Sequence, residues 1–214
     1  MEDVLDVYQR PLDEARPLVC LDEASKQLLS DARPALPLEP KTDQKQGQPL
    51  RQDSEYVRNG TASLFMVSAP LLGFRHVEIT DQRTRKDFAQ VIKTLVDVQF
   101  AQAEKIVLVM DNLNTHGPAS LYEAFAPAEA KRLADKLEIH YTPKHGSWLN
   151  MAEIELSVLA RQCLAERMDS KANLQKQVTA WQERRNAGSV KIDWRFTTDE
   201  ARVKLKRLYP TILP

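Results

Sequence analysis

The sequence has little that would indicate export, a disulfide framework or a membrane. Its two cysteines, Cys20 and Cys163, lie far apart in apolar stretches, which is typical of reduced, buried thiols. No run reaches the ~20 apolar residues that cross a bilayer, and the acidic start "MEDVLDVYQRP" lacks the pattern of a signal peptide. We therefore expect a cytoplasmic protein with no membrane partner.

Charge of one sign, sequence repeats and common cofactor motifs are also missing. The 30 basic and 30 acidic residues cancel, so the net charge gives no argument for a polyanionic partner. The run "IVLVMD" resembles the Mg²⁺-holding strand of P-loop phosphotransferases, but no GxxxxGK[ST] stretch accompanies it. The four histidines show no spacing typical of zinc sites. These absences argue against a repeat protein, a P-loop enzyme and a zinc protein.

What is present is the alternation of strands and helices of one α/β domain. With 43% apolar and 28% charged residues, the chain of 214 residues can bury a full core. In the first half, the apolar patterns predict a strand at 17–22 ending on Asp22, an irregular proline-rich loop at about 30–60, a hairpin of strands 61–70 and 73–80, and a helix at 85–102. A central strand at 106–110 followed by Asp111, a helix at 120–137 broken at Pro127 and a strand at 138–143 come next. The rest is predicted to form helices at 148–168 and 171–186, with Ser147 as N-cap of the first, and a short extended piece with a basic helix at 192–210. This order is compatible with a ribonuclease H-like mixed sheet flanked by helices.

Two aspartates stand where chemistry collects in such a sheet. Asp22 and Asp111 each follow an apolar strand, and ligands gather at strand ends in open α/β sheets. Either aspartate alone is most often a turn former. The pair is more suggestive of a site than either member.

A third acid comes from the helix that begins near residue 148. Glu153 and Glu155 are two residues apart, about 200° around the helix, so at most one faces a shared site. Glu153 shares its face with apolar or small neighbours, whereas Glu155 lies near Arg161, so we expect Glu153 at the site and Glu155 at the surface. A divalent cation shared with Asp22 and Asp111 would offset the several kcal/mol that an unpaired buried charge costs.

Three stretches closely resemble the catalytic motifs of a known family: "VCLDEAS", "VLVMDNLNTH" and "PKHGSWLNMAEIE". They are similar to the motifs of the DDE transposases of bacterial insertion sequences, in the branch allied to mariner elements. The similarity spans nearly the whole chain. It assigns the roles of the three acids to Asp22, Asp111 and Glu153, with the family's Asn-x-x-Glu pattern at Asn150 to Glu153.

The resemblance implies a specific activity. Such enzymes hold Mg²⁺ or Mn²⁺, as two ions, on a ribonuclease H-like fold. They act as metal-dependent endonucleases that cut DNA at the element ends and transfer the strand into target DNA, commonly at a TA step, without a covalent protein intermediate. The implied partners are DNA and a second copy of the chain, as a homodimer in a DNA complex in the bacterial cytoplasm at the nucleoid. Complete family members begin with helix-turn-helix modules, and no stretch before residue 17 is long enough to hold one.

Further residues near the three motifs are candidates for DNA contact or support. His116 and His145 are expected to support the metal site or contact a phosphate, and Lys144 is grouped with them. Trp148 either stacks on an extruded base or anchors the helix in the core, and we favour the core. Asn112 either orients Asp111 or forms a turn, and Asn150 alternatively serves the first turn of the helix. Trp181 and Trp194 are expected to be structural.

The chain divides, on this interpretation, into three parts. They are an N-terminal extension at 1–16, the catalytic domain at 17–187 with its insertion at about 30–60, and a basic helical tail at 188–214. Two alternatives to a transposase stay open. One is a ribonuclease H-like nuclease without strand transfer, which would use the same acids. The other is a non-catalytic remnant that only binds DNA or assembles.

Overall fold

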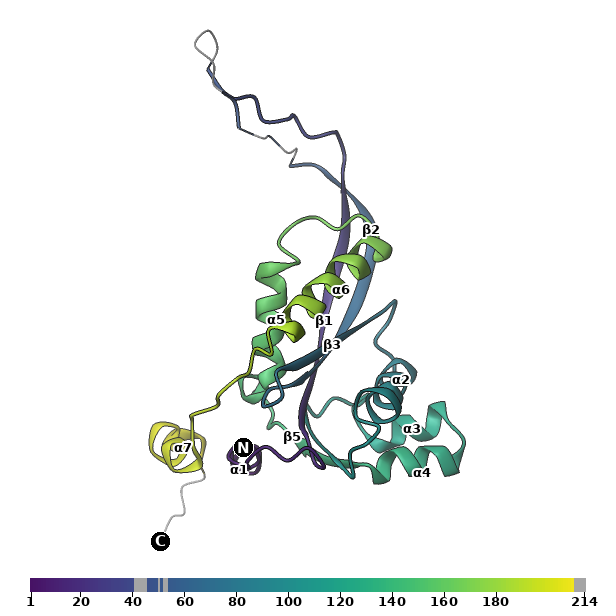
Figure 1. Ribbon diagram of the computed structural model, residues 1–214, viewed down its shortest axis with the longest axis vertical. Coiled ribbons are helices and arrows are strands. Elements are labelled where there is room, and N and C mark those ends of the chain that lie inside the picture. The colour runs from purple at the N-terminus through teal and green to yellow at the C-terminus, as the bar shows by residue number, and fades with distance from the viewer. Residues whose placement is uncertain (41–45, 50, 52–53, 210–214) are drawn as a thin grey trace.

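The fold is built on one mixed sheet of five strands. The computed structural model describes residues 1–40, 46–49, 51 and 54–209 (Figure 1). The strands run in the order β3-β2-β1-β4-β5. β1 pairs antiparallel with β2 and β2 with β3, while β4 lies parallel to both β1 and β5. Their bounds are Leu18–Asp31 for β1, Tyr56–Ala69 for β2, Phe74–Thr80 for β3, Ile106–Met110 for β4 and Leu137–Tyr141 for β5. The predicted mixed sheet is confirmed.

The first strand is longer than predicted, and Asp22 does not end it. β1 continues for nine residues past Asp22 and pairs with β2 as far as Asp31↔Tyr56. The prediction took the charged residues after Leu21 as the end of the strand. They remain in it because β2 pairs with this part of β1 and supplies its backbone hydrogen bonds.

The loop predicted at about 30–60 is correspondingly shorter. Two isolated bridges, Leu36↔Arg51 and Glu39↔Gln48, continue the antiparallel pairing beyond the strands. Together with β1 and β2 they form an arm that projects from the body of the molecule (Figure 1). The rest of the predicted loop, at 41–45, 50 and 52–53, lies outside the described residues.

Helices cover both faces of the sheet and create two separate cores (Figure 1). One face carries α1 (Glu2–Tyr8), α5 (Met151–Gln162) and α6 (Lys171–Ala187). The other carries α2 (Arg85–Thr94) with its π-helical continuation η1 (Leu95–Gln99), α3 (Pro118–Ala124) and α4 (Pro127–Asp135). The predicted break at Pro127 is confirmed, because this proline begins α4.

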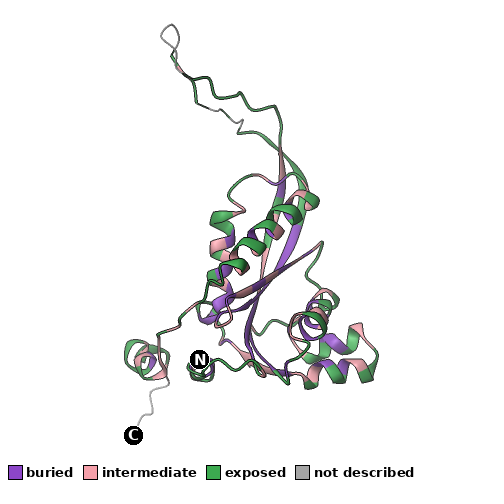
Figure 2. Cartoon of the chain, in the orientation of Figure 1, coloured by how far each residue is buried: buried purple, intermediate pink, exposed green. Residues whose placement is uncertain are grey.

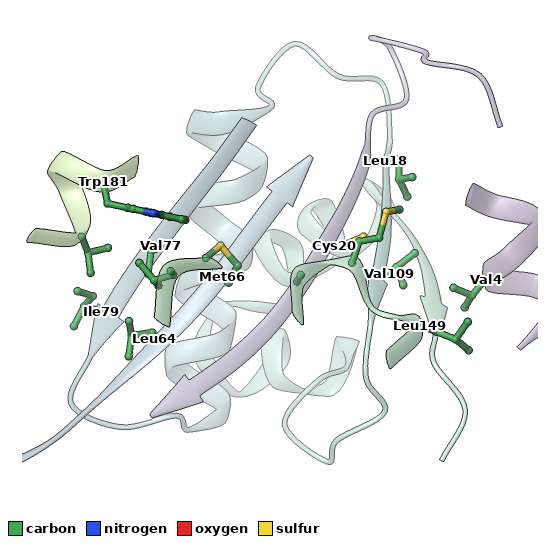
Figure 3. Packing of buried hydrophobic residues seen from close by; sticks show 14 of the residues in the cluster. Val4, Leu18, Cys20, Leu64, Met66, Val77, Ile79, Val109, Leu149 and Trp181 are labelled. Carbon is green, nitrogen blue, oxygen red and sulfur yellow. The ribbon is translucent and has the colours of Figure 1, made fainter. Parts of the chain in front are cut away.

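The strands in the middle of the sheet are buried on both faces (Figure 2). Cys20 and Val109 pack in the core beneath α5, together with Leu149 and Trp181 (Figure 3). Their neighbours Leu21 and Met110 belong to the core beneath α2. This alternation decides toward which helices each residue of β1 and β4 points.

The first and last helices of the described chain lie together on the side of the sheet that α5 covers. α7 (Thr198–Lys204) contacts α1, with Arg202 bonded to Glu2, and the short 3₁₀ turn η3 (Lys206–Leu208) follows it. The ring of Trp194 lies 5.1 Å from that of Tyr8. Trp181 is fully buried and Trp194 packs on the core, so both are structural as predicted. Among the helices of the described residues, none combines the length and apolar character needed to span a membrane.

Candidate functional site

Two candidate acids lie side by side because β1 and β4 are parallel neighbours. Cys20 pairs with Val109, and Asp22 and Asp111 each stand two residues further along. Since side chains alternate along a strand, Asp22 points toward the face that Cys20 packs on, which is the face covered by α5. Asp111 directly follows β4, as predicted.

The environment of Asp22 is unfavourable to its negative charge. The pKa of Asp22 is raised to about 6, mainly by burial. The backbone N–H of Glu23 donates to Oδ1 of Asp22 at 2.8 Å and acts in the opposite direction, lowering the pKa. The negative charges of Asp111 and Glu153 raise the pKa of Asp22 further. Asp111 and Glu153 therefore both lie within electrostatic range of Asp22.

The third acid is positioned by Asn150. The predicted N-cap Ser147 instead begins a 3₁₀ turn, η2 (Ser147–Leu149), and Asn150 caps α5 through Ala152 N–H at 3.1 Å. Its Nδ2 donates to the carbonyl of Leu21 at 2.8 Å, one residue before Asp22. Asn150 is buried, so one side chain fixes the start of α5 against β1. It thereby places Glu153, in the first turn of α5, next to Asp22.

The surface position expected for the second glutamate of α5 is wrong. Glu155, expected at the surface, is fully buried, whereas Glu153 is half-buried at the helix start. Oε1 of Glu155 accepts from Arg75 at 3.1 Å and from Arg185 at 2.9 Å. These partners on β3 and α6 are distant in the sequence, so the helical pattern alone gave no sign that the acid was compensated. The role of Glu153 at the site stays a prediction.

The rim of the site is formed by the loops that follow β4 and β5. They enclose a hollow of about 400 Å³ lined by Asp111, Asn112, Leu113, Thr142, Pro143, Lys144, His145 and Ser147. The side chains of Asn112, Lys144 and His145 are exposed. His145 adopts φ 62°, the left-handed conformation, in a tight loop. Asn112, Lys144 and His145 thus place exposed hydrogen-bond donors at the hollow that Asp111 also lines.

Trp148 does not anchor α5 in the core as expected. Its side chain is 43% exposed, and its ring lies 6.0 Å from that of Phe196. The core position beside it belongs to Leu149, which is buried. An exposed tryptophan at the rim keeps base stacking available.

His116 lies on the other side of Asp111, fully buried. One ring nitrogen bonds to Asp111 and the other to Glu23, which the sequence analysis did not single out. Arg83 also approaches Glu23, at 4.0 Å. The sequence signal for Glu23 was only its place after Asp22, since the contact with His116 joins residues 93 positions apart.

The residues present fit a hard divalent cation in their chemistry. Asp22, Asp111 and Glu153 offer carboxylate oxygens, the ligands that Mg²⁺ and Mn²⁺ take. A cation there would offset the burial and mutual repulsion that raise the pKa of Asp22. In the described part of the chain, no three His, Cys, Asp or Glu side chains are already close enough together to hold a metal ion. The acids are gathered, but they do not form a finished coordination shell.

Comparison with known proteins finds a matching family and solved structures of similar fold. The family described as "DDE superfamily endonuclease" matches residues 17–175. The crystal structure of the Mos1 mariner paired end complex with Mn has the same fold, with a TM-score of 0.57 and 16% identity over 88% of this chain and 55% of that chain. The Mos1 Strand Transfer Complex gives a TM-score of 0.56 and 15% identity over 89% of this chain and 59% of that one.

These likenesses set the scope of the comparison. At such low identity the two solved structures show a common fold, the ribonuclease H-like one expected from the sequence. The chain spans somewhat more than half the length of the Mos1 chains it matches. No curated protein sequence matches it.

Proposed function

This chain belongs to the DDE superfamily endonucleases, and we propose that it is the catalytic domain of a transposase that cuts DNA at element ends and transfers the cut strand into target DNA. One observation carries the proposal: Asp22 on β1 and Asp111 just past the end of β4 each stand two residues beyond a paired position of these parallel neighbours. Asn150 fastens the helix of Glu153 against β1. The similar Mos1 structures, one a paired end complex with Mn and the other a strand transfer complex, support DNA ends and target as substrates and Mg²⁺ or Mn²⁺ as cofactor.

In this proposal Asp22, Asp111 and Glu153 hold two Mg²⁺ or Mn²⁺ ions. Such ions activate an attacking oxygen and stabilise a leaving oxygen in phosphoryl transfer. The protein itself positions the ligands of these ions. Asn150 keeps the start of α5 against β1, so that the carboxylate of Glu153 stays near that of Asp22.

The exposed rim residues would bind the DNA strand. Lys144 and His145 offer donors to phosphate oxygens, Asn112 lies beside them, and Trp148 offers an exposed ring to a base. In the proposed division, residues 17–187 are the catalytic domain and 188–214 the tail. A homodimer would act on two DNA ends.

Two other functions remain distinguishable from this one. A nuclease without strand transfer would nick DNA with the same three acids but would not join ends to a target. A non-catalytic remnant would bind DNA and leave it uncut. Both are tested in the same experiment.

The test is nicking and strand transfer of DNA carrying the cognate ends, with Mn²⁺ or with EDTA. We expect both activities with Mn²⁺ and their loss in Asp22→Asn, Asp111→Asn and Glu153→Gln, because each removes one anionic ligand. Asp135→Asn, an exposed aspartate paired with Lys131 on α4, is the matched control and should retain activity. Nicking without joining would favour the nuclease. Full activity in any of the three variants, or activity in EDTA, would contradict the proposal.

A further inference from the structure

A histidine without exposed surface joins two carboxylates at the edge of the site. The side chain of His116 is 0% exposed, its Nε2 lies 2.7 Å from Oε1 of Glu23, and its Nδ1 bonds to Oδ1 of Asp111. Ionised carboxylates only accept hydrogen bonds, so both ring nitrogens donate.

The imidazole ring is held independently of these two carboxylates. It stacks on Phe88 with 4.9 Å between centroids and 29° between planes. The backbone of His116 is also fixed, since its N–H donates to Leu113 O at 2.9 Å and its carbonyl accepts from the hydroxyl of Tyr141 at 3.1 Å. The ring is therefore a rigid reference point, and the carboxylate of Asp111 takes its orientation from it.

Glu23 holds the other end of the ring from the opposite face of β1. It follows Asp22, so the two side chains point to opposite faces of the sheet. The Glu23 side chain is only 4% exposed, and a buried carboxylate costs several kcal/mol unless it is paired. His116 supplies the close partner, and Arg83 lies 4.0 Å from the second oxygen. Glu23 thus faces the ring rather than the space shared by the three candidate ligands.

From this geometry we propose that Glu23 and His116 are positioning residues that together fix the carboxylate of Asp111, leaving its second oxygen for a divalent cation. The inference rests on the proposed function, because it presupposes a cation at Asp111. Carboxylates that bind metals are themselves held by hydrogen bonds, and loss of such partners lowers metal affinity about 10–100-fold. The two residues act through Asp111 and touch neither DNA nor cation.

Two substitutions of His116 separate positioning from simple packing. The amide nitrogen of asparagine is as many bonds from Cα as Nδ1 of histidine, and that of glutamine as many as Nε2. His116→Asn can therefore still donate to Asp111, whereas His116→Gln can reach only Glu23. Mn²⁺ affinity of the whole chain, measured from the electron paramagnetic resonance signal of free Mn²⁺, should stay near that of the unsubstituted chain in His116→Asn and fall about 10–100-fold in His116→Gln.

The same contrast tests Glu23. Glu23→Gln keeps a polar group beside Nε2 of His116, whereas Glu23→Met keeps the length of the side chain without a hydrogen-bonding oxygen. We expect Glu23→Gln to retain Mn²⁺ affinity and Glu23→Met to lose it. Thermal unfolding followed by circular dichroism shows whether each variant is folded at the temperature of the titration.

A second histidine bridge provides the matched control. His140 on β5 lies between Asp3, at 2.8 Å, and Glu138, at 3.1 Å, and contacts none of the three candidate ligands in the described structure. His140→Gln should leave Mn²⁺ affinity unchanged. Equal affinity in His116→Asn and His116→Gln, whether retained or lost, would overturn the positioning role alone. Absence of Mn²⁺ binding by the unsubstituted chain would overturn the metal site and this role with it.

Discussion

Glu155 shows how the partners of one side chain decide its role. It is buried at the centre of α5 between two guanidinium groups, Arg75 and Arg185. In the described structure Oε2 of Glu155 and the Nε atoms of both arginines have no hydrogen-bond partner. The cluster is therefore held by the two charge-assisted hydrogen bonds to Oε1, with two cations beside one anion in a region of low dielectric.

Replacing Glu155 with a neutral residue should lower the free energy of unfolding and leave the candidate site unchanged. Glu155→Gln leaves Arg75 and Arg185 buried without a counter-charge, and breaking a buried pair in this way costs about 3–5 kcal/mol. Urea denaturation followed by circular dichroism measures the loss. Glu166→Gln, at an exposed position, is the control and should change stability little. A loss below about 1 kcal/mol, the size of a surface pair, would show that the cluster is not held by charge.

At the scale of elements, the start of α5 decides where Glu153 stands. The apolar pattern predicted a helix here, but the prediction placed its cap three residues too early, at Ser147. Boundaries of this kind depend on which polar side chain finds a partner elsewhere in the fold. Asn150 is the cap because its Nδ2 donates to the carbonyl of Leu21 on β1 while its Oδ1 accepts from the first turn of the helix.

Asn150→Ala should therefore cost stability and metal affinity together. It removes a cap worth about 1 kcal/mol and leaves the buried carbonyl of Leu21 unpaired, at about 1–3 kcal/mol. Ser170→Ala removes the cap of α6, which accepts from Asn173 N–H and lies away from the acids. We expect chemical denaturation to show a loss in both variants, and Mn²⁺ titration to show weaker binding only in Asn150→Ala. Equal Mn²⁺ affinity in the two would mean that the cap does not position Glu153.

At the scale of the whole molecule, the N-terminal segment is part of the packed body. Tyr8 is buried, and its hydroxyl donates to Leu149 O at 2.6 Å, so α1 supports the loop that precedes α5. Beyond α1, Arg10 and Arg16 both reach Glu138 on the outer strand β5. Residues more than 120 positions apart are joined by these ion pairs.

The stability that the ion pairs of Glu138 contribute should depend on pH. The hydrogen bond from Arg10, helped by His140 and Arg16, holds the pKa of Glu138 at about 2, well below 4.5, despite partial burial. A lowered pKa means that the folded state favours the carboxylate, so its stability is present above pH 4.5 and is lost as the pH falls through about 2. Glu138→Gln should destabilise the protein at neutral pH by less than about 1 kcal/mol.

The measurement is the difference in urea unfolding between Glu138→Gln and the unsubstituted chain, taken from pH 7 down to about 3. The difference should shrink below pH 4.5 because the carboxylate begins to be protonated in the unfolded chain. Glu14→Gln, at an exposed position nearby, is the control. A difference that grows toward acid pH would contradict the assigned sign.

The sequence by itself determined the periodicities, and with them the class of fold. Continuous apolar runs, alternation and helical spacing are local properties, so the hairpin, the central strand before Asp111, the break at Pro127 and the mixed sheet all followed from them. Asp22 and Asp111 were found in the same way, as polar residues at the ends of apolar runs, whereas Glu153 was chosen by its helix face and by the resemblance to a known family. That Asp22 and Asp111 lie near each other followed from the fold, once β1 and β4 were known to be parallel neighbours.

Only the tertiary structure decided which charged side chains are paired and where elements end. β1 continues past Asp22 because β2 pairs with it, Glu155 is buried because Arg75 and Arg185 meet it, and Glu23 matters because His116 reaches it. Each of these contacts joins residues that are 30 or more positions apart or lies between separate elements, and hydrogen bonds of this kind leave no local period in a sequence. The free energy of a buried charge depends on its partners, so its position could be known only after folding had brought those partners together.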